Sequence, residues 1–293
     1  MPAQVATYAY KTTAGCDIRA DVIRRAKPKP RAPVIVYFHG GALIFGTRKQ
    51  VNPDEFDRFL DAGFVIVSAD YRLAPETKLP AIIEDVQDAV GWVRYEGPHL
   101  FGIDPERLAV MGHSAGGYLT LMSGFRVTPR PRALVSFYGY GDIAGDWYAK
   151  PDPFYCREPK VSREEAFSCV GAEPVSQPKK DRFRFYLYCR QKGLWPKEVA
   201  GLDPLGEREK FKPFCPLENI TPDYPPTILL HGDRDTDVPY EQSVLLAREL
   251  KRAGVENELV TISGGGHGFD EDMTDPQAAS AVARAVVFLK RIL

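Results

Sequence analysis

Short, continuous apolar runs recur along the chain, and the segments between them carry apolar residues at helical spacing. Runs of this kind are typical of strands that are covered on both faces of a sheet. They lie at 34–38, 64–68, 108–111, 132–139, 227–232 and 258–263. Helical spacing predicts helices at 80–95, at about 240–252 and at 277–292. Strands that alternate with helices in this way predict a parallel sheet with helices on both faces.

The first part of the chain departs from this alternation. Residues 5–10 and 16–25 alternate weakly between apolar and polar types and are separated by a Thr-Ala-Gly turn, which predicts an antiparallel hairpin. A further helix is expected to begin at Pro53, with Asn52 as its N-cap. The sheet is therefore expected to be parallel for the most part rather than throughout.

A long segment from Asp142 to Asn219 interrupts the alternation, because it contains no long buried strand. It is rich in aromatic residues, Lys, Arg and Pro, and a structureless loop of this length is improbable in a compact domain. We expect a helical insertion, so the chain is predicted to have an α/β core at 1–141 and 220–293 and a cap at 142–219. Most of the basic residues in the cap are expected on a solvated surface. Two placements stay open: a cap over the strand ends, where open parallel sheets bind ligands, and a peripheral packing unit.

Charge and cysteine content narrow the class of partners. The chain has 38 basic and 39 acidic residues, a formal net charge of −1, so nothing in the total predicts a nucleic-acid partner. No apolar run reaches the ~20 residues of a membrane span, and the N-terminus lacks the features of a signal peptide. The five cysteines are odd in number and show no C-x-x-C spacing, which predicts free thiols, a cytoplasmic location and no structural zinc site.

The candidate chemistry begins at Ser114. The apolar run before it ends in Gly112, and a helix-compatible run follows Gly116, so the serine is expected at a sharp strand-to-helix turn. The pattern G-x-S-x-G at such a turn indicates a nucleophile elbow. A serine hydroxyl needs a base within hydrogen-bond reach and an acid that orients the base.

Chain order selects the base. In folds with this elbow the order is serine, acid, histidine, and of the five histidines two follow Ser114. We favour His267, because it lies in a glycine-rich loop after the last strand that can reach back over the sheet edge, whereas His231 closes the strand before it. The residues alone leave the acid open. The candidates are Asp142, Asp233, Asp235 and Asp237.

Five motifs together resemble the α/β-hydrolase superfamily, and specifically the hormone-sensitive-lipase-like carboxylesterases with a His-Gly-Gly signature. They are His39-Gly-Gly-Ala, Asp70-Tyr-Arg-Leu-Ala-Pro-Glu, Gly112-His-Ser-Ala-Gly-Gly, His231-Gly-Asp-Arg-Asp-Thr-Asp-Val-Pro and Gly266-His-Gly-Phe. The resemblance implies an α/β-hydrolase fold with a mostly parallel, eight-stranded sheet and a helical cap. It also implies that Asp235 is the acid, with Asp237 second.

The same resemblance implies an oxyanion hole formed by the backbone N–H groups of Gly41, Ala42 and Ala115. Preorganised donors of this kind stabilise the negative charge of a tetrahedral intermediate. The chain departs from the family at Ala42, where a third glycine is usual. Alanine keeps its N–H, so we expect the hole to survive with a narrower pocket. The resemblance also implies that Tyr71 and Arg72 organise loops beneath the site. It implies that Glu76 supports the loop that begins with His39-Gly-Gly-Ala, which we call the oxyanion loop.

These inferences predict a serine hydrolase without metal or cofactor that cleaves a carboxylic ester through an acyl-enzyme intermediate. Ser114, Asp235 and His267 form its predicted triad, and the substrate is expected to be a small to medium, apolar or aromatic small molecule. Three alternatives stay open: a lactone, thioester or amide substrate in a metabolic pathway, a non-hydrolytic enzyme, and a ligand-binding protein on the same scaffold. The substrate-binding residues and the choice between monomer and dimer are left open.

Overall fold

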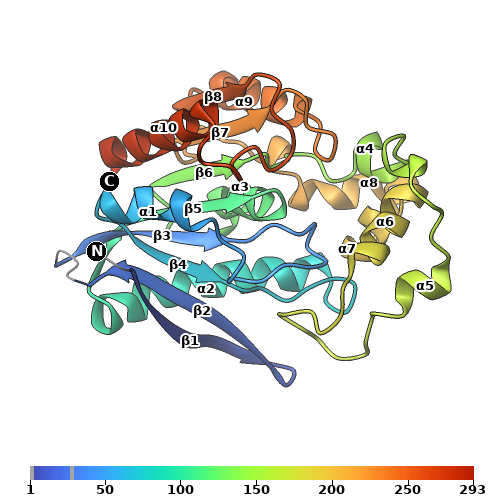
Figure 1. Cartoon of the computed structure of the whole chain (residues 1–293), viewed down its shortest axis with the longest axis horizontal. Coiled ribbons are helices and arrows are strands. Elements are labelled where there is room, and N and C mark those ends of the chain that lie inside the picture. The colour runs from blue at the N-terminus through green and yellow to red at the C-terminus, as the bar shows by residue number, and fades with distance from the viewer. Residues whose placement is uncertain (1–2, 27–29) are drawn as a thin grey trace.

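A computed structural model describes residues 3–26 and 30–293, and in it eight strands form one sheet with the order β1-β2-β4-β3-β5-β6-β7-β8 (Figure 1). The strands are β1 (Ala3–Thr13), β2 (Cys16–Arg25), β3 (Ala32–Phe38), β4 (Val65–Ala69), β5 (Ile103–His113), β6 (Ala133–Phe137), β7 (Thr227–Gly232) and β8 (Asn257–Ile262). The pairs β1–β2 and β2–β4 are antiparallel, and the other pairs are parallel. The predicted fold class is confirmed, including the mostly parallel, eight-stranded sheet.

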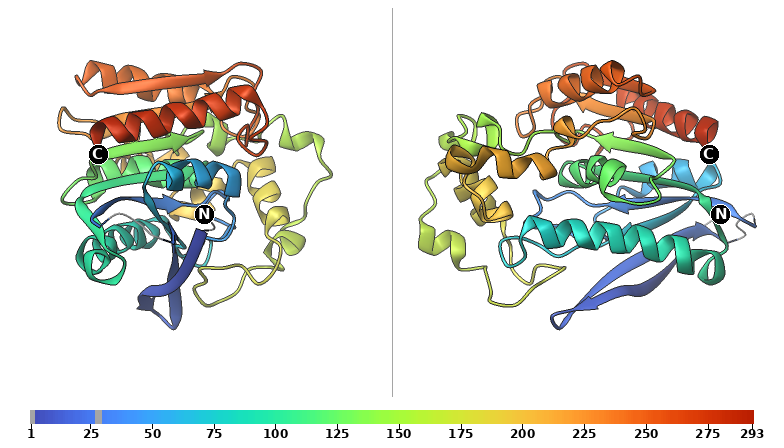
Figure 2. Two further views of the ribbon diagram at one scale, coloured as in Figure 1. Left: turned by 60° about the vertical axis from the view of Figure 1, so that its left-hand side comes forward. Right: turned by 180° about the vertical axis from the view of Figure 1, so that it is seen from behind.

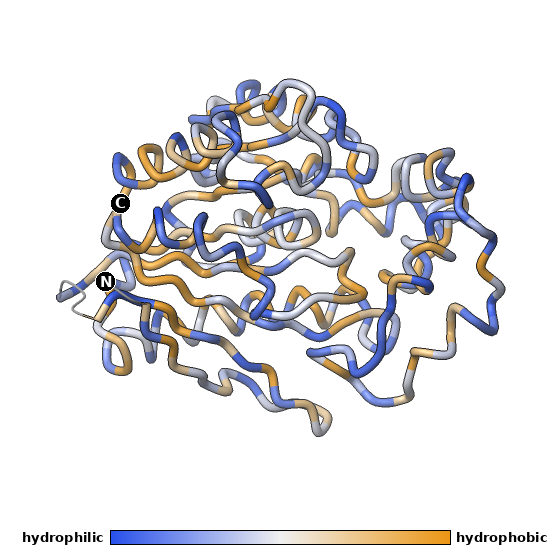
Figure 3. Tube along the Cα trace, viewed as in Figure 1, coloured by the Kyte–Doolittle hydropathy of each residue, from blue (hydrophilic) through white to orange (hydrophobic). Residues whose placement is uncertain are grey.

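Helices cover both faces of this sheet (Figures 1 and 2). On one face, α1 (Pro53–Asp61) and α10 (Pro276–Ile292) bury Phe59 and Phe288 against Ile35 and Val135. The other face is covered by α2 (Leu79–Leu100), α3 (Ala115–Arg126) and α9 (Glu241–Arg252). The central strands are correspondingly hydrophobic along their length (Figure 3), because side chains on both faces are out of contact with water.

Element ends differ from the prediction where polar residues extend a strand or backbone geometry ends one. The elbow strand begins at Ile103 rather than near residue 108, because its first part pairs with Ala32. Strand β6 ends at Phe137 rather than at residue 139, since Tyr138 takes a positive φ of 36° that a strand does not allow. Asn52 caps α1 as predicted, accepting hydrogen bonds from the backbone of Asp54 and Glu55.

The segment between β6 and β7 contains short helices and no strand among residues 142–219, all of which the structure describes. The helices are α4 (Asp146–Ala149), α5 (Arg163–Phe167), α6 (Phe183–Lys192), α7 (Trp195–Ala200) and α8 (Pro204–Phe211), with 3-10 turns at Tyr155–Arg157, Lys212–Phe214 and Pro216–Glu218. We call residues 142–219 the cap segment. It lies beyond the carboxyl ends of the parallel strands (Figures 1 and 2). Within the described ranges, every helix is too short or too polar for a membrane span.

The turn from β5 into α3 is packed against the end of β3, and only glycine fits at two of its positions. A Cβ atom on Gly112 would lie 2.3 Å from the carbonyl oxygen of Gly116. A Cβ on Gly116 would lie 1.9 Å from the carbonyl oxygen of Phe38. Both neighbours are backbone atoms, which cannot rotate away as a side chain can, so a larger residue must displace the sheet.

We therefore expect Gly116→Ala to lower the free energy of unfolding by about 3 kcal/mol or more, because the new methyl group overlaps the carbonyl of Phe38. Gly91→Ala in α2 is the matched control: nothing lies within 4 Å of its Cβ position, so it is expected to stabilise the protein by about 0.5–1 kcal/mol. Urea denaturation followed by circular dichroism measures both. Equal midpoints for the two variants would contradict this account of the elbow.

Candidate active site

Ser114 lies at the tip of the turn between β5 and α3 and has a strained backbone. Its φ of 55° and ψ of −116° lie outside the regions that residues other than glycine usually adopt. Its N–H donates to the carbonyl of Phe137 at 2.9 Å, and this bond holds the turn against the end of β6. Strain of this kind persists where the surrounding structure imposes it and is concentrated at functional sites.

Asp235 and His267 lie on loops that follow β7 and β8 and meet at one carboxylate. Oδ2 of Asp235 is 2.8 Å from Nδ1 of His267. The other oxygen, Oδ1, accepts hydrogen bonds from the backbone N–H groups of Asp237 at 2.8 Å and Val238 at 2.9 Å. The two loops are also joined directly, since the N–H of Arg234 donates to the carbonyl of Gly265. The structure thus pairs the predicted base with the acid that the resemblance implied.

A second histidine shares the same carboxylate. His231 is fully buried, and its Nε2 lies 3.2 Å from Oδ2 of Asp235 and 3.1 Å from the carbonyl of Val238. Its Nδ1 lies 2.7 Å from the hydroxyl oxygen of Ser243. Because a carbonyl only accepts, Nε2 carries the proton, and His231 is a buried donor that holds Asp235 from behind. The competing acid Asp142 lies elsewhere and pairs with Arg208.

These contacts set the pKa values of Asp235 and His267. Burial raises the pKa of Asp235, but hydrogen bonds from His231 and His267 outweigh it, so the pKa ends well below its usual range. Burial lowers the pKa of His267, but the hydrogen bond to Asp235 and the charges of Asp237, Asp235 and Asp270 outweigh it and raise the pKa above its ordinary value. Asp235 is therefore an anion beside an imidazole that protonates readily.

Ser114 and His267 both contact the end of β6, at Phe137 and Tyr138, and are not hydrogen-bonded to each other. Among the described residues, no hydrogen bond joins Oγ of Ser114 to Nε2 of His267, and Nε2 instead lies 3.5 Å from Oδ2 of Asp237. The ring of His267 packs on Tyr138, with centroids 4.5 Å apart, directly after the end of β6. Hydrogen bonds of a catalytic serine are often long without substrate and shorten in the complex.

The loop after β3 brings backbone N–H groups close to Ser114. Gly40 lies against it, since a Cβ on that residue would be 3.5 Å from Cβ of Ser114. Gly41 has a φ of 106°, and its carbonyl accepts from the N–H groups of Ile44 and Phe45, which folds the loop back. Within residues 3–26 and 30–293, the N–H groups predicted to form the oxyanion hole donate to no protein acceptor. These are the N–H groups of Gly41, Ala42 and Ala115.

Ala42 occupies a conformation that favours glycine, with a φ of 54°. Its carbonyl accepts a hydrogen bond of 2.9 Å from the indole N–H of Trp195 at the start of α7. Trp195 is fully buried, so this bond fixes the oxyanion loop to the cap segment. Tyr71 supports the same loop from beneath: its hydroxyl donates to the carbonyl of His39, and the two rings stack at 4.3 Å.

Two arginines of the cap segment are buried beside the site, although most of its basic residues are exposed, as the sequence predicted. Arg182 is 3% exposed, pairs with Glu76 at 2.6 Å and donates to the carbonyl of Ile44. Glu76 thus supports the oxyanion loop through Arg182. Arg190 is 1% exposed and pairs with Asp237 at 2.6 Å. The sequence did not single out these arginines, because a charge-rich segment carries no signal of which side chains are buried.

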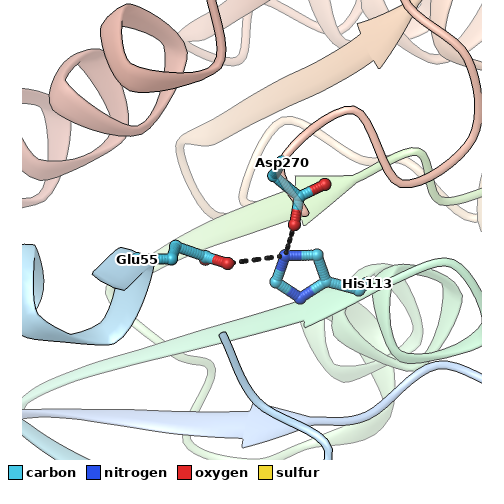
Figure 4. Close-up of side chains that lie close together, drawn as sticks. All are labelled: Glu55, His113 and Asp270. Carbon is cyan, nitrogen blue, oxygen red and sulfur yellow. Dashed lines mark ion pairs between the residues drawn. The ribbon is translucent and has the colours of Figure 1, made fainter. Parts of the chain in front are cut away.

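A further buried cluster lies beneath the elbow (Figure 4). Nε2 of His113, the residue before Ser114, is 3.2 Å from Oε2 of Glu55 in α1 and 3.0 Å from Oδ2 of Asp270 in the loop of His267. Burial lowers the pKa of His113, but the two carboxylates outweigh it and raise the pKa to about 10. Sequence reasoning missed this cluster, and the one signal for it was the histidine inside the elbow motif.

Glu55, His113 and Asp270 are also the group, within the described residues, whose ligand atoms lie close enough to hold a metal ion, all within 4.8 Å of one another. A metal ligand must be a neutral imidazole. Since the two carboxylates keep His113 protonated at neutral pH, the arrangement fits an ion pair better than a metal centre. The predictions of no metal and no cofactor stay predictions.

A strained serine between a parallel strand and a helix, with an acid and a histidine on the following strand ends, defines a hydrolase-type site on a doubly covered sheet. The comparison with family models agrees with this class. The model of the alpha/beta hydrolase fold matches residues 35–271, and the chain belongs to that family. The predicted resemblance to the α/β-hydrolase superfamily is confirmed, and an esterase is among the similar proteins.

The similar curated proteins are of two kinds. Non-reducing polyketide synthase Preu6 from Preussia isomera is 28% identical over 308 residues, which cover 92% of this chain and 14% of that protein. Esterase LipC from Mycobacterium tuberculosis is 29% identical over 279 residues, which cover 92% of this chain and 60% of that protein. The chain therefore spans a small part of the synthase and three fifths of the esterase.

Solved structures share the whole fold. A protein of unknown function from Staphylococcus aureus has a TM-score of 0.80 at 24% identity, with 98% of this chain and 99% of that chain covered. Esterase Est2 from Thermogutta terrifontis with bound propionate has a TM-score of 0.70 at 24% identity, covering 98% and 94%. At these identities the likeness shows the fold alone.

The buried pair Glu76–Arg182 gives a prediction for stability. Glu76→Gln leaves the Arg182 charge buried without its counter-ion, so we expect the free energy of unfolding to fall by about 3–5 kcal/mol. Urea denaturation measures it, with Glu173→Gln in the exposed part of the cap segment as control. The double variant Glu76→Gln/Arg182→Met is expected to recover part of the loss. If the single variant is as stable as the control, the pair does not anchor the cap segment.

Proposed function

We propose that this protein is a serine carboxylesterase-like hydrolase that cleaves a carboxylic ester of a small molecule through an acyl-enzyme intermediate. The observation that carries the proposal is the contact of His267 with the buried Asp235, at the sheet edge where the strained Ser114 lies. The unpaired N–H groups of the oxyanion loop support it, because they supply donors where negative charge would develop. The alpha/beta hydrolase family and the likeness to esterase LipC support the same reaction class.

In the proposed reaction, the hydroxyl oxygen of Ser114 attacks the ester carbonyl while its proton passes to Nε2 of His267. The N–H groups of Gly41, Ala42 and Ala115 donate to the resulting oxyanion. The bond to the alcohol then breaks, and the alcohol leaves with the proton from His267. Water next gives a proton to His267 and attacks the acyl carbon, and the Ser114 oxygen leaves with that proton as the carboxylic acid is released. Asp235 orients and stabilises the imidazolium throughout.

The cap segment is proposed to cover this site and to set the substrate range. Several of its residues contact the site loops: Trp195 binds Ala42, Arg190 pairs with Asp237, and the ring of Tyr186 lies 5.9 Å from that of Phe45. An aromatic cover of this kind suits a small to medium substrate with an apolar or aromatic part. The predicted cytoplasmic location and the choice of monomer or dimer stay predictions.

The relatives named as polyketide synthases favour a second candidate, the hydrolysis of a thioester or lactone of a polyketide-like substrate. The same triad and oxyanion donors serve an ester, a thioester and a lactone, so the site geometry does not separate them. A panel of matched oxygen esters, thioesters and lactones separates the two candidates by kcat/KM.

The first test removes the nucleophile. Ser114→Ala is expected to lower kcat for a short-chain nitrophenyl ester by about 10⁴-fold or more, because no other group in the site can form the acyl-enzyme. A fluorophosphonate is expected to label the parent protein at Ser114 and to leave the variant unlabelled, by mass spectrometry. Ser280→Ala, in the exposed part of α10, is the control. Unchanged hydrolysis in Ser114→Ala would rule out the proposed mechanism.

The second test reads the pKa of the base. His267 must be neutral to accept a proton, so kcat/KM is expected to rise with pH through a pKa above the ordinary value for histidine, because nearby carboxylates raise it. Asp237→Asn removes the negative charge 3.5 Å from Nε2 of His267, which is expected to lower the pKa of His267. The rise of kcat/KM, the acid limb of the pH profile, is then expected at lower pH.

Asp233→Asn is the matched control for that test, since Asp233 lies in the same loop and binds the backbone of Gly264 instead. Its pH profile is expected to stay in place. A limb that moves to higher pH in Asp237→Asn, or that moves equally in both variants, would contradict the electrostatic account of His267.

A further inference from the structure

A pocket of about 520 Å³ opens beside the candidate active site. Its walls include Gly40 and Gly41 of the oxyanion loop, His113 immediately before the nucleophile, and Tyr138, whose ring packs on His267. The pocket therefore adjoins the candidate triad, although Ser114, Asp235 and His267 do not themselves line it. Nothing in the proposed acyl-transfer steps uses its remaining walls, which come from α1, the chain before it, and the loop after His267.

The charged groups in these walls are mostly acidic. Glu55, Asp270 and Glu271 line the pocket together with one basic side chain, His113, and no Lys or Arg of residues 3–26 and 30–293 lines it. The balance is negative even with His113 protonated. Burial raises the pKa of Glu55 although the charge of His113 opposes this, so nearby positive charge favours the ionised form of Glu55.

Two carboxylate oxygens in this pocket wall have no partner. His113 contacts Oε2 of Glu55 and Oδ2 of Asp270, while Oε1 of Glu55 and Oδ1 of Asp270 accept no hydrogen bond from the described residues. Glu55 is 1% exposed and Asp270 4% exposed. Buried carboxylate oxygens normally accept hydrogen bonds, and leaving one without a donor costs about 1–3 kcal/mol or more. Nδ1 and Nε2 of His113 also make no hydrogen bond within the described chain, so charge holds this cluster together and its two free oxygens are left for a donor in the pocket.

Aromatic rings complete the pocket. Tyr37, Phe45 and Tyr138 lie in its walls, and the faces of aromatic rings attract cations. An anionic group would face three carboxylates here, and a purely apolar group would leave the two acceptors unsatisfied. A group that is cationic and carries several N–H donors satisfies both the charge and the acceptors.

We infer that this pocket binds a protonated amine carried by the substrate, so that the hydrolase prefers esters with an ammonium group a few bonds from the scissile carbonyl. This inference rests on the proposed function. An ammonium group offers three N–H donors to the oxygens of Glu55 and Asp270, and Glu271 at the exposed rim attracts it. The apolar or aromatic part of the substrate then lies toward the cap segment.

Three nitrophenyl esters with acyl chains of equal length test the inference. They are the ester of ω-aminohexanoic acid, the ester of heptanoic acid, and the mono-ester of heptanedioic acid, which end in an ammonium, a methyl and a carboxylate group. At low ionic strength, kcat/KM is expected to be about tenfold higher for the ammonium ester than for the methyl ester, and lowest for the carboxylate ester. The ammonium-to-methyl ratio is expected to fall as salt is added.

Charge-removing variants locate the preference. Glu271→Gln, at the exposed rim, is expected to lower the ammonium-to-methyl ratio severalfold, and Asp270→Asn to lower it further. Because Asp270 is buried and can affect folding, the Glu271 variant decides the test by itself if the Asp270 variant does not fold. Glu96→Gln, in the exposed part of α2, is the matched control and is expected to leave the ratio unchanged.

The amine pocket and the hydrolase activity can be ruled out separately. If Ser114 takes up the fluorophosphonate and the methyl ester is cleaved as well as or better than the ammonium ester, the amine pocket is wrong and the hydrolase stands. The amine pocket is also wrong if Glu271→Gln and Glu96→Gln change the ammonium-to-methyl ratio of kcat/KM by the same factor. If none of the three esters is cleaved and Ser114 is not labelled, the proposed function fails and the inference with it.

Discussion

The close approach of Gly116 to the carbonyl of Phe38 is the contact on which the site depends. It allows the turn after β5 to lie directly against the end of β3, where parallel pairing already sets Phe38 opposite Gly112. Because the two strands end side by side, the loops that follow them begin at the same edge, and the oxyanion loop reaches Ser114 through backbone atoms alone. The positive φ of Ser114 is a consequence of this packing, since the chain must reverse into α3 without moving away from β3.

Buried charged side chains connect the loops that follow these strands. One oxygen of Asp235 contacts both His231 and His267, so its carboxylate fixes the loop after β8 against the loop after β7. Arg182 and Arg190 extend the same principle into the cap segment, where each is buried against a carboxylate of the core. Removing one partner of such a pair leaves a buried charge, which makes the position of the cap segment over the strand ends energetically specific.

Periodicity and motif order predicted the sheet, the elbow, Ser114 and His267, and the resemblance to the family supplied Asp235 as the candidate acid. Continuous apolar runs identify buried strands because both faces of a parallel sheet are covered, and Ser114 and His267 follow from glycine spacing and chain order. The cluster of Glu55, His113 and Asp270 could not be found this way, since its members come from three distant elements and each is an ordinary helix, strand or loop residue by type. The same holds for the buried Arg182 and Arg190, whose surroundings are set by tertiary packing that no local pattern encodes.

The position of this cluster links substrate binding to the catalytic geometry. His113 immediately precedes Ser114, and Asp270 lies three residues after His267, so the ion pair between them spans the elbow and the loop of the base. A cation that enters the pocket adds positive charge beside both carboxylates and competes with His113 for them. Any change at Glu55 or Asp270 therefore alters the spacing of the triad as well as the charge of the pocket. The ratio of rates for two substrates of equal length separates these effects, because a misplaced triad slows both substrates alike and a changed pocket charge slows only one.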